Sequence, residues 1–488
     1  MSDPIQVGEL LPGVLAEVVD RAGHGYARWA ELVAQAGYCH HPIRLAGRVE
    51  QADRATGEVR TVYDSDREPD GVLLKACGTR RESRCPSCAA TYRADAYQLL
   101  AAGLKGGKGV PESVAGHPRL FVTFTAPSFG RVHSRKAQGR LVLPCHPYRQ
   151  GARCPHGVRD GCWHRHDEDD PRLGEPLCAA CYDSRAQVLW NALAPELWRR
   201  TTIAVQRALA RLVGLQEGEL RRLVRVSYAK VAEFQRRGAI HFHAVLRLDA
   251  ATECRCPACL TSPPEPFTAE LLEEAVRQAA AAVTVPCPPL QEDGPGRYAR
   301  WGEQLDIRNI TRDGDDQARE LSAEQVAGYI AKYATKATES FGAGLDRRLG
   351  PDDLEQLDQL PAHVAELVRA AWTLGGRAEL EPLRLRAWAH MLGFRGHWST
   401  KSRRYSTTFT VLRRARVAFA KRRRAKDGVP LDAWDRPEDD DQVVIVASWA
   451  YVGRGYETEG ERWLALSAAA RAREQRQVAR EELRTMAA

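Results

Sequence analysis

The chain has 488 residues, of which 44% are hydrophobic and 27% are charged. This length and balance predict two or three folded domains and exclude general disorder. The first residues carry no basic segment followed by an apolar one, and no apolar run of about 18 residues occurs anywhere in the sequence. We therefore expect a cytoplasmic protein without a membrane partner.

Positive charge is concentrated in one stretch. The formal net charge is +8, and residues 401–426 contain 11 Lys or Arg and no Asp or Glu, so the rest sums to about −3. Such a stretch favours nucleic acid through counterion release, although a solvated helix face is the alternative interpretation. The residues predicted to bind DNA are Lys401, Arg403, Arg404, Arg413, Arg414, Lys421, Arg422, Arg423 and Arg424.

In chain order, residues 1–115 form a predicted N-terminal accessory region that ends in the glycine-rich stretch 103–107. Apolar patterning then predicts a buried strand at 120–125, a cysteine-rich excursion to 183 and a helix at 188–213. Strands at 223–235 and 239–248 follow, then a second excursion, a helix at 268–283 and a strand at 304–310. Residues 346–488 are predicted to be mainly helical and to bind DNA, with an acidic loop at 438–441.

The 13 cysteines are an odd number, and they fall mostly into clusters. Without a secretion signal, metal ligation is a better explanation than disulfides, and the Cys-x-x-Cys pairs 85/88 and 178/181 have the spacing of zinc ligands. The candidate ligands of structural Zn²⁺ are Cys77, Cys85, Cys88, Cys154, Cys162, Cys178 and Cys181, and the second cluster also contains Cys145, His156, His164 and His166. Cys254, Cys256 and Cys259 form a weaker third cluster. Buried or merely reduced thiols are the alternative.

Two histidines stand two residues apart in an apolar strand. His241 and His243 therefore project from the same face of the predicted sheet, where they could bind a metal. The three-residue loop 236–238 ends in glycine, as such hairpin loops favour, and this register places Glu233 directly opposite His241. Glu233 is thus the expected third ligand, and Gln235 replaces it if the loop is shifted by one residue.

Two tyrosines share a predicted helix that Ser322 begins, with Gln325 three residues on as in a capping box. The helix is expected to run to about residue 338. The i, i+4 spacing of Tyr329 and Tyr333 places both phenols on one face beside Lys332. A phenol has a pKa of about 10, so it needs a nearby cation to act as a nucleophile. Simple packing of the helix on the sheet is the alternative.

Three stretches together resemble the ordered motifs of the HUH rolling-circle replication initiators, and most closely those of actinomycete plasmids and integrative elements. They are Phe121–Gly130 (FVTFTAPSFG), Glu233–His243 (EFQRRGAIHFH) and Tyr329–Lys336 (YIAKYATK). Further similar stretches are Cys85–Cys88 (CPSC), Pro176–Tyr182 (PLCAACY) and Phe394–Tyr405 (FRGHWSTKSRRY). The resemblance covers roughly residues 70–410.

The resemblance implies an α+β fold with a central antiparallel sheet and flanking helices. The nicking domain would span residues 116–345, with cysteine-rich insertions near 140–183 and 250–300. His241 and His243 would bind Mg²⁺ or Mn²⁺, Tyr329 and Tyr333 would be the nucleophiles, and Lys332 would assist them. Glu233 is added by the strand geometry and not by the family motif.

The implied reaction is metal-assisted transesterification at a replication origin, giving a 5′-phosphotyrosyl link and a free 3′-hydroxyl primer. The partners would be single-stranded or extruded origin DNA, a host helicase and a DNA polymerase, since the sequence lacks the Gly-x-x-x-x-Gly-Lys-Ser/Thr motif of a helicase. The alternatives are a zinc-stabilised DNA-binding regulator without catalysis, or a relaxase or transposase of the same superfamily. A relaxase would carry its tyrosine ahead of the histidines.

Overall fold

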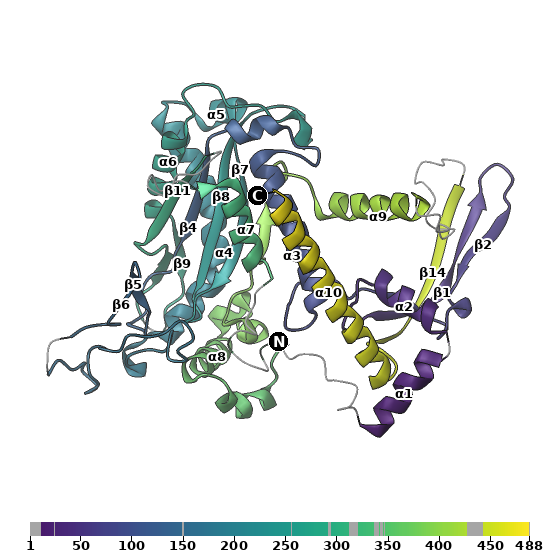
Figure 1. Cartoon of the computed structure of the whole chain (residues 1–488). Coiled ribbons are helices and arrows are strands. Elements are labelled where there is room, and N and C mark those ends of the chain that lie inside the picture. Colours follow the sequence, from purple (N-terminus) through teal and green to yellow (C-terminus); the bar gives the residue numbers. More distant parts are fainter. Residues whose placement is uncertain are drawn as a thin grey trace. The chain divides into compact units, whose positions relative to one another are not determined.

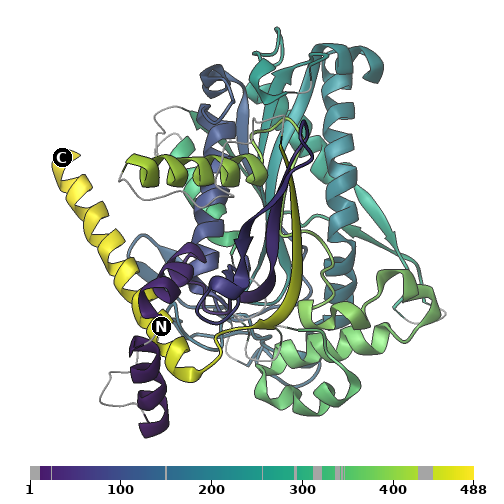
Figure 2. The same cartoon turned by 90° about the vertical axis from the view of Figure 1, so that its right-hand side faces the viewer.

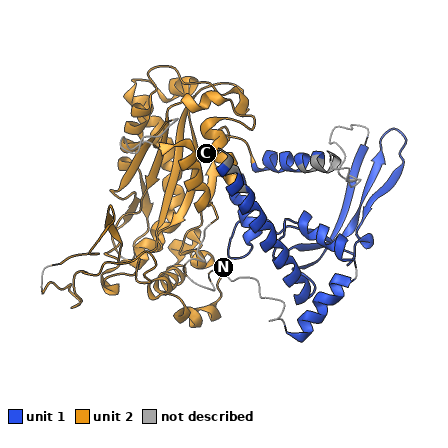
Figure 3. Ribbon diagram, viewed as in Figure 1, with its two compact units in different colours: residues 1–95, 409–488 blue, residues 96–408 orange. Residues whose placement is uncertain are grey.

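The computed structural model describes residues 11–23, 25–148, 151–254, 256–290, 294–311, 321–335, 341, 345, 347–426 and 443–487 (Figure 1). The chain forms two compact units, one of residues 1–95 with 409–488 and one of residues 96–408 (Figure 3). We predicted three consecutive regions, whereas the structure joins N-terminal and C-terminal residues in the first unit. Within the described residues, no helix is both long and apolar enough to cross a membrane.

The first unit is built on a sheet in which β14 (Val443–Arg454), β1 (Ile43–Asp53) and β2 (Val59–Asp64) are neighbours and β3 (Leu73–Lys75) also pairs with β1. All of these pairs are antiparallel. The strand β14 was missed, because we expected residues 346–488 to be mainly helical. The acidic stretch 438–441 lies outside the described residues.

The helical parts of the first unit come from both ends of the chain, as Figure 2 shows. A small core of Trp29, Leu32, Val33, Cys39 and Ala465 joins them. The helices are α1 (Pro12–Gly23), α2 (Tyr26–Gln35), α9 (Phe409–Lys426), α10 (Glu459–Ala487) and the short η2 (Ser65–Arg67). The helix α3 (Pro86–Lys105) begins in this unit and continues into the second.

The second unit contains a six-stranded sheet with the histidine strand inside it. The strand order is β12 (Leu321–Ser322), β11 (Leu305–Thr311), β4 (Arg119–Phe124), β8 (Ile240–Ala250), β7 (Val224–Phe234) and β13 (Ser399–Lys401). All neighbours are antiparallel except β11 and β12, which are parallel. The predicted α+β class is therefore confirmed, and its sheet is mixed.

The two faces of this sheet have different roles. On one face, Phe124 and Phe242 pack edge-on against Trp198 of the long helix α4 (Ser184–Leu212), within the main apolar core. The helices α6 (Ala269–Ala282) and α8 (Ala362–Leu374) contribute Leu272 and Leu367 to that core. Side chains alternate along a strand, so His241 and His243 belong to the opposite face, which carries the helix α7 (Ala323–Tyr333).

The remaining elements of the second unit are short. They are α5 (Glu217–Leu223), β5 (Lys136–Gln138), β6 (Leu141–Leu143), β9 (Thr284–Cys287), β10 (Arg297–Arg300), and the 3-10 turns η3 (Glu112–Gly116), η4 (Ala179–Cys181), η5 (Pro257–Cys259), η7 (Pro351–Gln359), η8 (Ala378–Leu383) and η9 (Arg386–Met391). The strands β5 and β6 form a hairpin inside the cysteine-rich excursion, and β9 and β10 form a second one.

The glycine-rich stretch 103–107 does not end the first unit. Gly103 lies inside α3, and the helix continues to Lys105. A Cβ at Gly103 would lie 2.3 Å from Cε1 of Tyr405, whose side chain is fully buried. This glycine is therefore present because the helix packs directly on an aromatic ring.

Candidate functional site

The hairpin of β7 and β8 has the register that the sequence predicts. The N–H group of Gln235 donates to the carbonyl oxygen of Ala239 at 2.8 Å, and Gly238 has a φ of 75°. Gly238 therefore occupies the left-handed position of a three-residue loop. Glu233 is paired with His241, as expected.

Both ring nitrogens of His243 have partners. Its Nε2 lies 2.8 Å from Oε2 of Glu233, and its Nδ1 lies 3.1 Å from Oγ1 of Thr123 on β4. The side chain is buried, and the ring of Phe121 stacks on it at a centroid distance of 6.0 Å. The imidazole is thus held in one orientation by two neighbouring strands.

His241 differs from His243, because its Nε2 is buried without a hydrogen-bond partner. Burial lowers the pKa of His241, and the nearby His243 and Arg237 lower it further, to about 3. The ring is therefore neutral at physiological pH, with a lone pair that can bind a metal. The ring centroids of His241 and His243 lie 6.0 Å apart.

The helix α7 places two phenols over the histidines. Ser322 and Gln325 form the predicted capping box at its start. The ring centroids of Tyr329 and Tyr333 lie 5.1 and 5.7 Å from that of His243, and 4.8 Å from each other. The structure therefore brings together the two motifs that the sequence singled out. Residues 336–338, the expected end of this helix, lie outside the described part of the chain.

The phenols are protonated in this environment. Burial raises the pKa of Tyr329, and its hydrogen bond with Tyr333 raises it further. Burial and the charge of Glu233 likewise raise the pKa of Tyr333. Lys332 lies beside them, with Nζ 5.9 Å from the centroid of the Tyr333 ring. A cation is therefore needed near the phenol oxygen before either tyrosine can act as a nucleophile.

A large cleft opens at the end of the sheet where β4 and β7 end and β8 and β11 begin. Its volume is about 1310 Å³, and the loop 236–238 and part of the cysteine-rich excursion line it. Its walls carry Arg131, Arg135, Arg236, Arg237, Arg277 and Arg300, with Glu168 and Glu303 as acidic members. The sequence did not predict this cleft, because its arginines come from segments far apart in the chain.

The basic stretch 401–426 contains both partly or fully buried and exposed side chains. Lys401 donates to the carbonyl oxygen of Ser406 at 3.0 Å, and burial lowers its pKa to about 8. Arg404 is buried and donates to the carbonyl oxygen of Thr252 at 2.9 Å. These two side chains therefore stabilise loops through hydrogen bonds to backbone carbonyls. Exposed members are Arg403, Arg413, Arg414 and Arg422, whereas the side chains of Lys421, Arg423 and Arg424 lie outside the described part.

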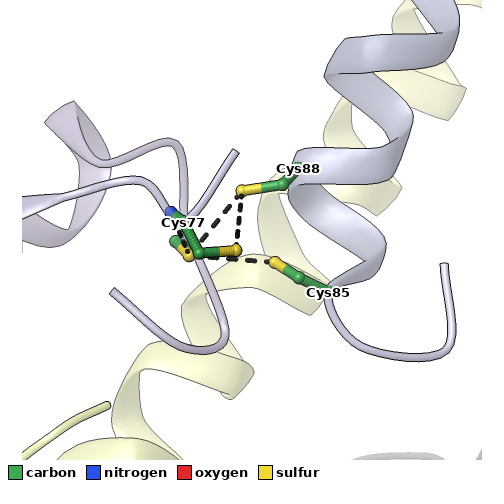
Figure 4. Close-up of side chains that lie close together, drawn as sticks. Cys77, Cys85 and Cys88 are labelled. Atoms are coloured by element: carbon green, nitrogen blue, oxygen red, sulfur yellow. Dashed lines mark hydrogen bonds between the residues drawn. The ribbon is translucent and has the colours of Figure 1, made fainter. Parts of the chain in front are cut away.

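The cysteines and histidines form several groups whose donor atoms lie within 4.8 Å of one another. The first adds Cys39 to the predicted Cys77, Cys85 and Cys88 (Figure 4). The second predicted cluster separates into two groups, one of His133, Cys145, Cys162 and His166, and one of Cys154, His156, Cys178 and Cys181. Cys254, Cys256 and Cys259 form a three-membered group, and His164 joins His166 and Asp170 in another. These groups could hold a metal such as zinc.

Sequence reasoning missed Asp170 and two members of the cysteine groups, Cys39 and His133. Cys39 lies 38 residues before Cys77, and it is paired with no other cysteine in sequence. His133 lies in a polar stretch before the second cluster. Neither has a local spacing signal, so only the fold reveals them.

Comparison with known proteins assigns the chain to a family. Residues 25–470 match the family model described as RepSA, replication initiator protein of pSAM2. The chain is also 43% identical to a replication initiator protein of Streptomyces ambofaciens over 491 residues, which cover 99% of this chain and 96% of that protein. The chain therefore belongs to this family of replication initiator proteins. No solved structure matches it.

Proposed function

We propose that this replication initiator nicks one strand of origin DNA through a tyrosine on α7, as an HUH-type endonuclease. The observation that carries the proposal is the placement of Tyr329 and Tyr333 over His243, with Glu233 hydrogen-bonded to that histidine. A simple packing role for the tyrosines would not need a partly buried carboxylate and two histidines on the facing strands. The origin would be that of a plasmid or an integrative element.

The chemistry of the donors on β7 and β8 supports a divalent metal such as Mg²⁺ or Mn²⁺ in this proposal. His241 has a buried, unpartnered and neutral nitrogen, and Glu233 offers the hard oxygen ligand that these ions prefer. His241, His243 and Glu233 would hold the ion. When bound, it would supply positive charge to the phosphate and to the leaving oxygen.

The chain itself provides the nucleophile and its position. The phenol oxygen of one tyrosine would form a bond to phosphorus while the bond from phosphorus to the 3′ oxygen breaks. The phenol proton leaves to solvent, and the released 3′ oxygen takes a proton from solvent to become the hydroxyl that primes a polymerase. Lys332 would lower the cost of the phenolate charge. Because the ester is exchanged and not hydrolysed, the second tyrosine could repeat the step and release a circular strand in rolling-circle replication.

The substrate would be single-stranded or extruded DNA. The tyrosines pack against His243 of the sheet, so they would reach a phosphate of duplex DNA only after the duplex opens locally. The family supports origin DNA as the partner. A host helicase and polymerase would then unwind and extend the nicked strand.

The test is to incubate the purified protein with labelled single-stranded origin DNA and Mn²⁺ and to separate products on denaturing gels. Wild type is compared with Tyr329→Phe, Tyr333→Phe and the double variant, with the exposed Tyr298→Phe as the matched control. We expect a covalent protein–DNA adduct that needs metal, persists in the control and disappears in the double variant. Tight binding without an adduct or nick, with any divalent metal, would instead indicate a zinc-stabilised DNA-binding regulator.

A further inference from the structure

We infer that the chain binds three zinc ions, one at Cys39, Cys77, Cys85 and Cys88 in the first unit and two in the cysteine-rich excursion of the second. The excursion sites are His133, Cys145, Cys162 and His166, and Cys154, His156, Cys178 and Cys181. These ions are separate from the proposed catalytic metal, and their presence does not depend on the nicking reaction.

The four sulfurs of the first site have the spacing of a tetrahedral zinc centre. The Sγ atom of Cys39 lies 3.8 Å from that of Cys85 and 3.6 Å from that of Cys88, and Cys88 lies 3.6 Å from Cys77 (Figure 4). A zinc ion with Zn–S bonds of about 2.3 Å separates its sulfurs by about 3.8 Å, whereas a disulfide bond is about 2.05 Å long. The distances therefore fit metal ligation.

The surroundings of the first site stabilise thiolates. The N–H groups of His40 and Cys77 donate to the sulfurs of Cys85 and Cys39, each at 3.3 Å. Cys85 and Cys88 stand at the start of α3, where the helix dipole favours negative charge. Cys39 follows α2, and Cys77 follows β3. One ion would thus join three elements of a unit whose apolar core is small.

The second site combines two histidines and two cysteines. Nε2 of His166 lies 3.2 Å from Nδ1 of His133 and 3.6 Å from Sγ of Cys162. The other nitrogen of His166 lies 2.7 Å from Oδ2 of Asp170. A carboxylate in this position fixes the ring and leaves Nε2 free for a metal, as is common for zinc-bound histidines.

The third site lies in the same excursion. Nδ1 of His156 lies 3.2 Å from the sulfur of Cys181 and 3.9 Å from that of Cys178. Cys154 and His156 fall between Cys145 and Cys162 of the second site in sequence. The two ligand sets therefore alternate along the chain. Each ion would crosslink a segment that contains ligands of the other ion.

The excursion needs such crosslinks because it has almost no core. Within the described residues 127–148 and 151–181, Cys145 is the one buried hydrophobic side chain. Segments that cannot bury apolar surface are commonly stabilised by a metal. The excursion also places Arg131, His133 and Arg135 in the wall of the arginine-lined cleft, so the ions would hold that wall in place.

The group of Cys254, Cys256 and Cys259 is excluded from the proposal. Its sulfurs lie 3.0 and 2.9 Å apart, well below the edge of a tetrahedral zinc site, and two of the three cysteines are exposed. Among the described residues, it also offers three donors and not four. We therefore expect this group to hold no zinc.

The proposal is tested by counting metals in the full chain, purified without added zinc, by native mass spectrometry and elemental analysis. We expect three zinc ions per chain. X-ray absorption at the zinc edge should give an average of three sulfurs and one nitrogen per ion, because the three sites together offer nine sulfurs and three nitrogens. This measurement uses wild type and does not depend on any variant folding.

Single substitutions then assign the sites. Cys88→Ala, Cys145→Ala and Cys181→Ala should each lose one zinc, whereas Cys287→Ala, which changes a cysteine outside every group, should keep three. Fewer than three zinc ions in folded wild type, iron in place of zinc, or a fourth zinc that Cys256→Ala removes would each overturn the proposal. Nicking activity plays no part in these readouts, so failure here is distinct from failure of the proposed function.

Discussion

The carboxylate of Glu233 lies 2.8 Å from Nε2 of His243, although the backbone of Glu233 is paired with His241. The side chain thus reaches along the strand to the next histidine on the same face. This contact places an oxygen donor on the imidazole of His243, which the rings of Tyr329 and Tyr333 also contact. The proposed third metal ligand is therefore a single residue, and a substitution can test it.

Substitution of Glu233 should weaken the metal site. We expect Glu233→Gln to raise the Mn²⁺ concentration needed for half-maximal adduct formation by about 10- to 100-fold, because a neutral amide replaces a charged oxygen ligand. Gln235→Ala is the matched control. In the observed register Glu233, and not Gln235, is paired with His241, and Oε1 of Gln235 accepts from Arg237 at 2.8 Å. An unchanged metal requirement in Glu233→Gln, or an equal rise in Gln235→Ala, would show that Glu233 is not a ligand.

The arginine-lined cleft and the exposed arginines of α9 should bind different forms of DNA. Arg300 lines the cleft, and we expect Arg300→Gln to weaken binding of a short single strand and to reduce the slope of log K against log salt by about 0.7. The exposed Arg413 and Arg414 on α9 should instead affect duplex origin DNA, with a slope change of about 0.9 for each arginine. Fluorescence anisotropy across a salt series measures both.

Arg199→Gln is the control for these titrations, because Arg199 is exposed, is paired with Glu196 on α4 and belongs neither to the cleft lining nor to α9. If the α9 variants weakened the short single strand as much as Arg300→Gln does, the cleft would not be the single-strand site.

A buried lysine should make the free energy of unfolding depend on pH above neutrality. Lys230 is buried with Nζ 3.9 Å from the ring centroid of Phe242, and burial lowers its pKa to about 7. The unfolded chain keeps this proton up to a pH of about 10.4, so it binds more protons than the folded chain between these values. Wild-type stability from this group therefore rises with pH, and the cost of burying the charge is largest at pH 7 and below.

Lys230→Met should remove that cost. We expect the variant to gain stability relative to wild type at pH 7, and the difference to fall by about 1 kcal/mol for each pH unit up to pH 9. Urea unfolding at pH 7, 8 and 9 measures it. A difference that stays constant with pH would show that Lys230 does not titrate in this range.

Gly103 should be intolerant of a side chain. Alanine normally favours a helix over glycine by about 1 kcal/mol, but the new Cβ would overlap the ring of Tyr405. We expect Gly103→Ala to cost about 1–3 kcal/mol of unfolding free energy, seen as a lower melting temperature. Gly218→Ala in α5, where a Cβ meets nothing within 4 Å, is the control and should not lower it. A stabilised Gly103→Ala would contradict the close packing.

Several features of the candidate site could be predicted because they depend on local geometry. The loop 236–238 and its glycine fix the register that places Glu233 opposite His241. The capping box of Ser322 and Gln325 fixes where α7 begins, and the spacing of Tyr329 and Tyr333 fixes their shared face. The order of the motifs in the sequence also carried the family resemblance, and the comparisons confirm the replication initiator family.

Other features depend on which distant segments pack together, and no local pattern encodes that choice. The strand β14 pairs with β1 from the other end of the chain, and it was missed because the region 346–488 is otherwise mainly helical. Cys39 and His133 join cysteine groups that sequence spacing does not connect them to. Lys401 and Arg404 carry charge like their neighbours, yet in the fold they donate to backbone carbonyls. The sequence by itself determined which side chains face each other on the β7–β8 hairpin and which share a face of α7, because hydrogen-bond register and side-chain periodicity are short-range. Only the tertiary structure decided which residues complete each metal group and which arginines line the cleft, because both arise from contacts between segments far apart in sequence.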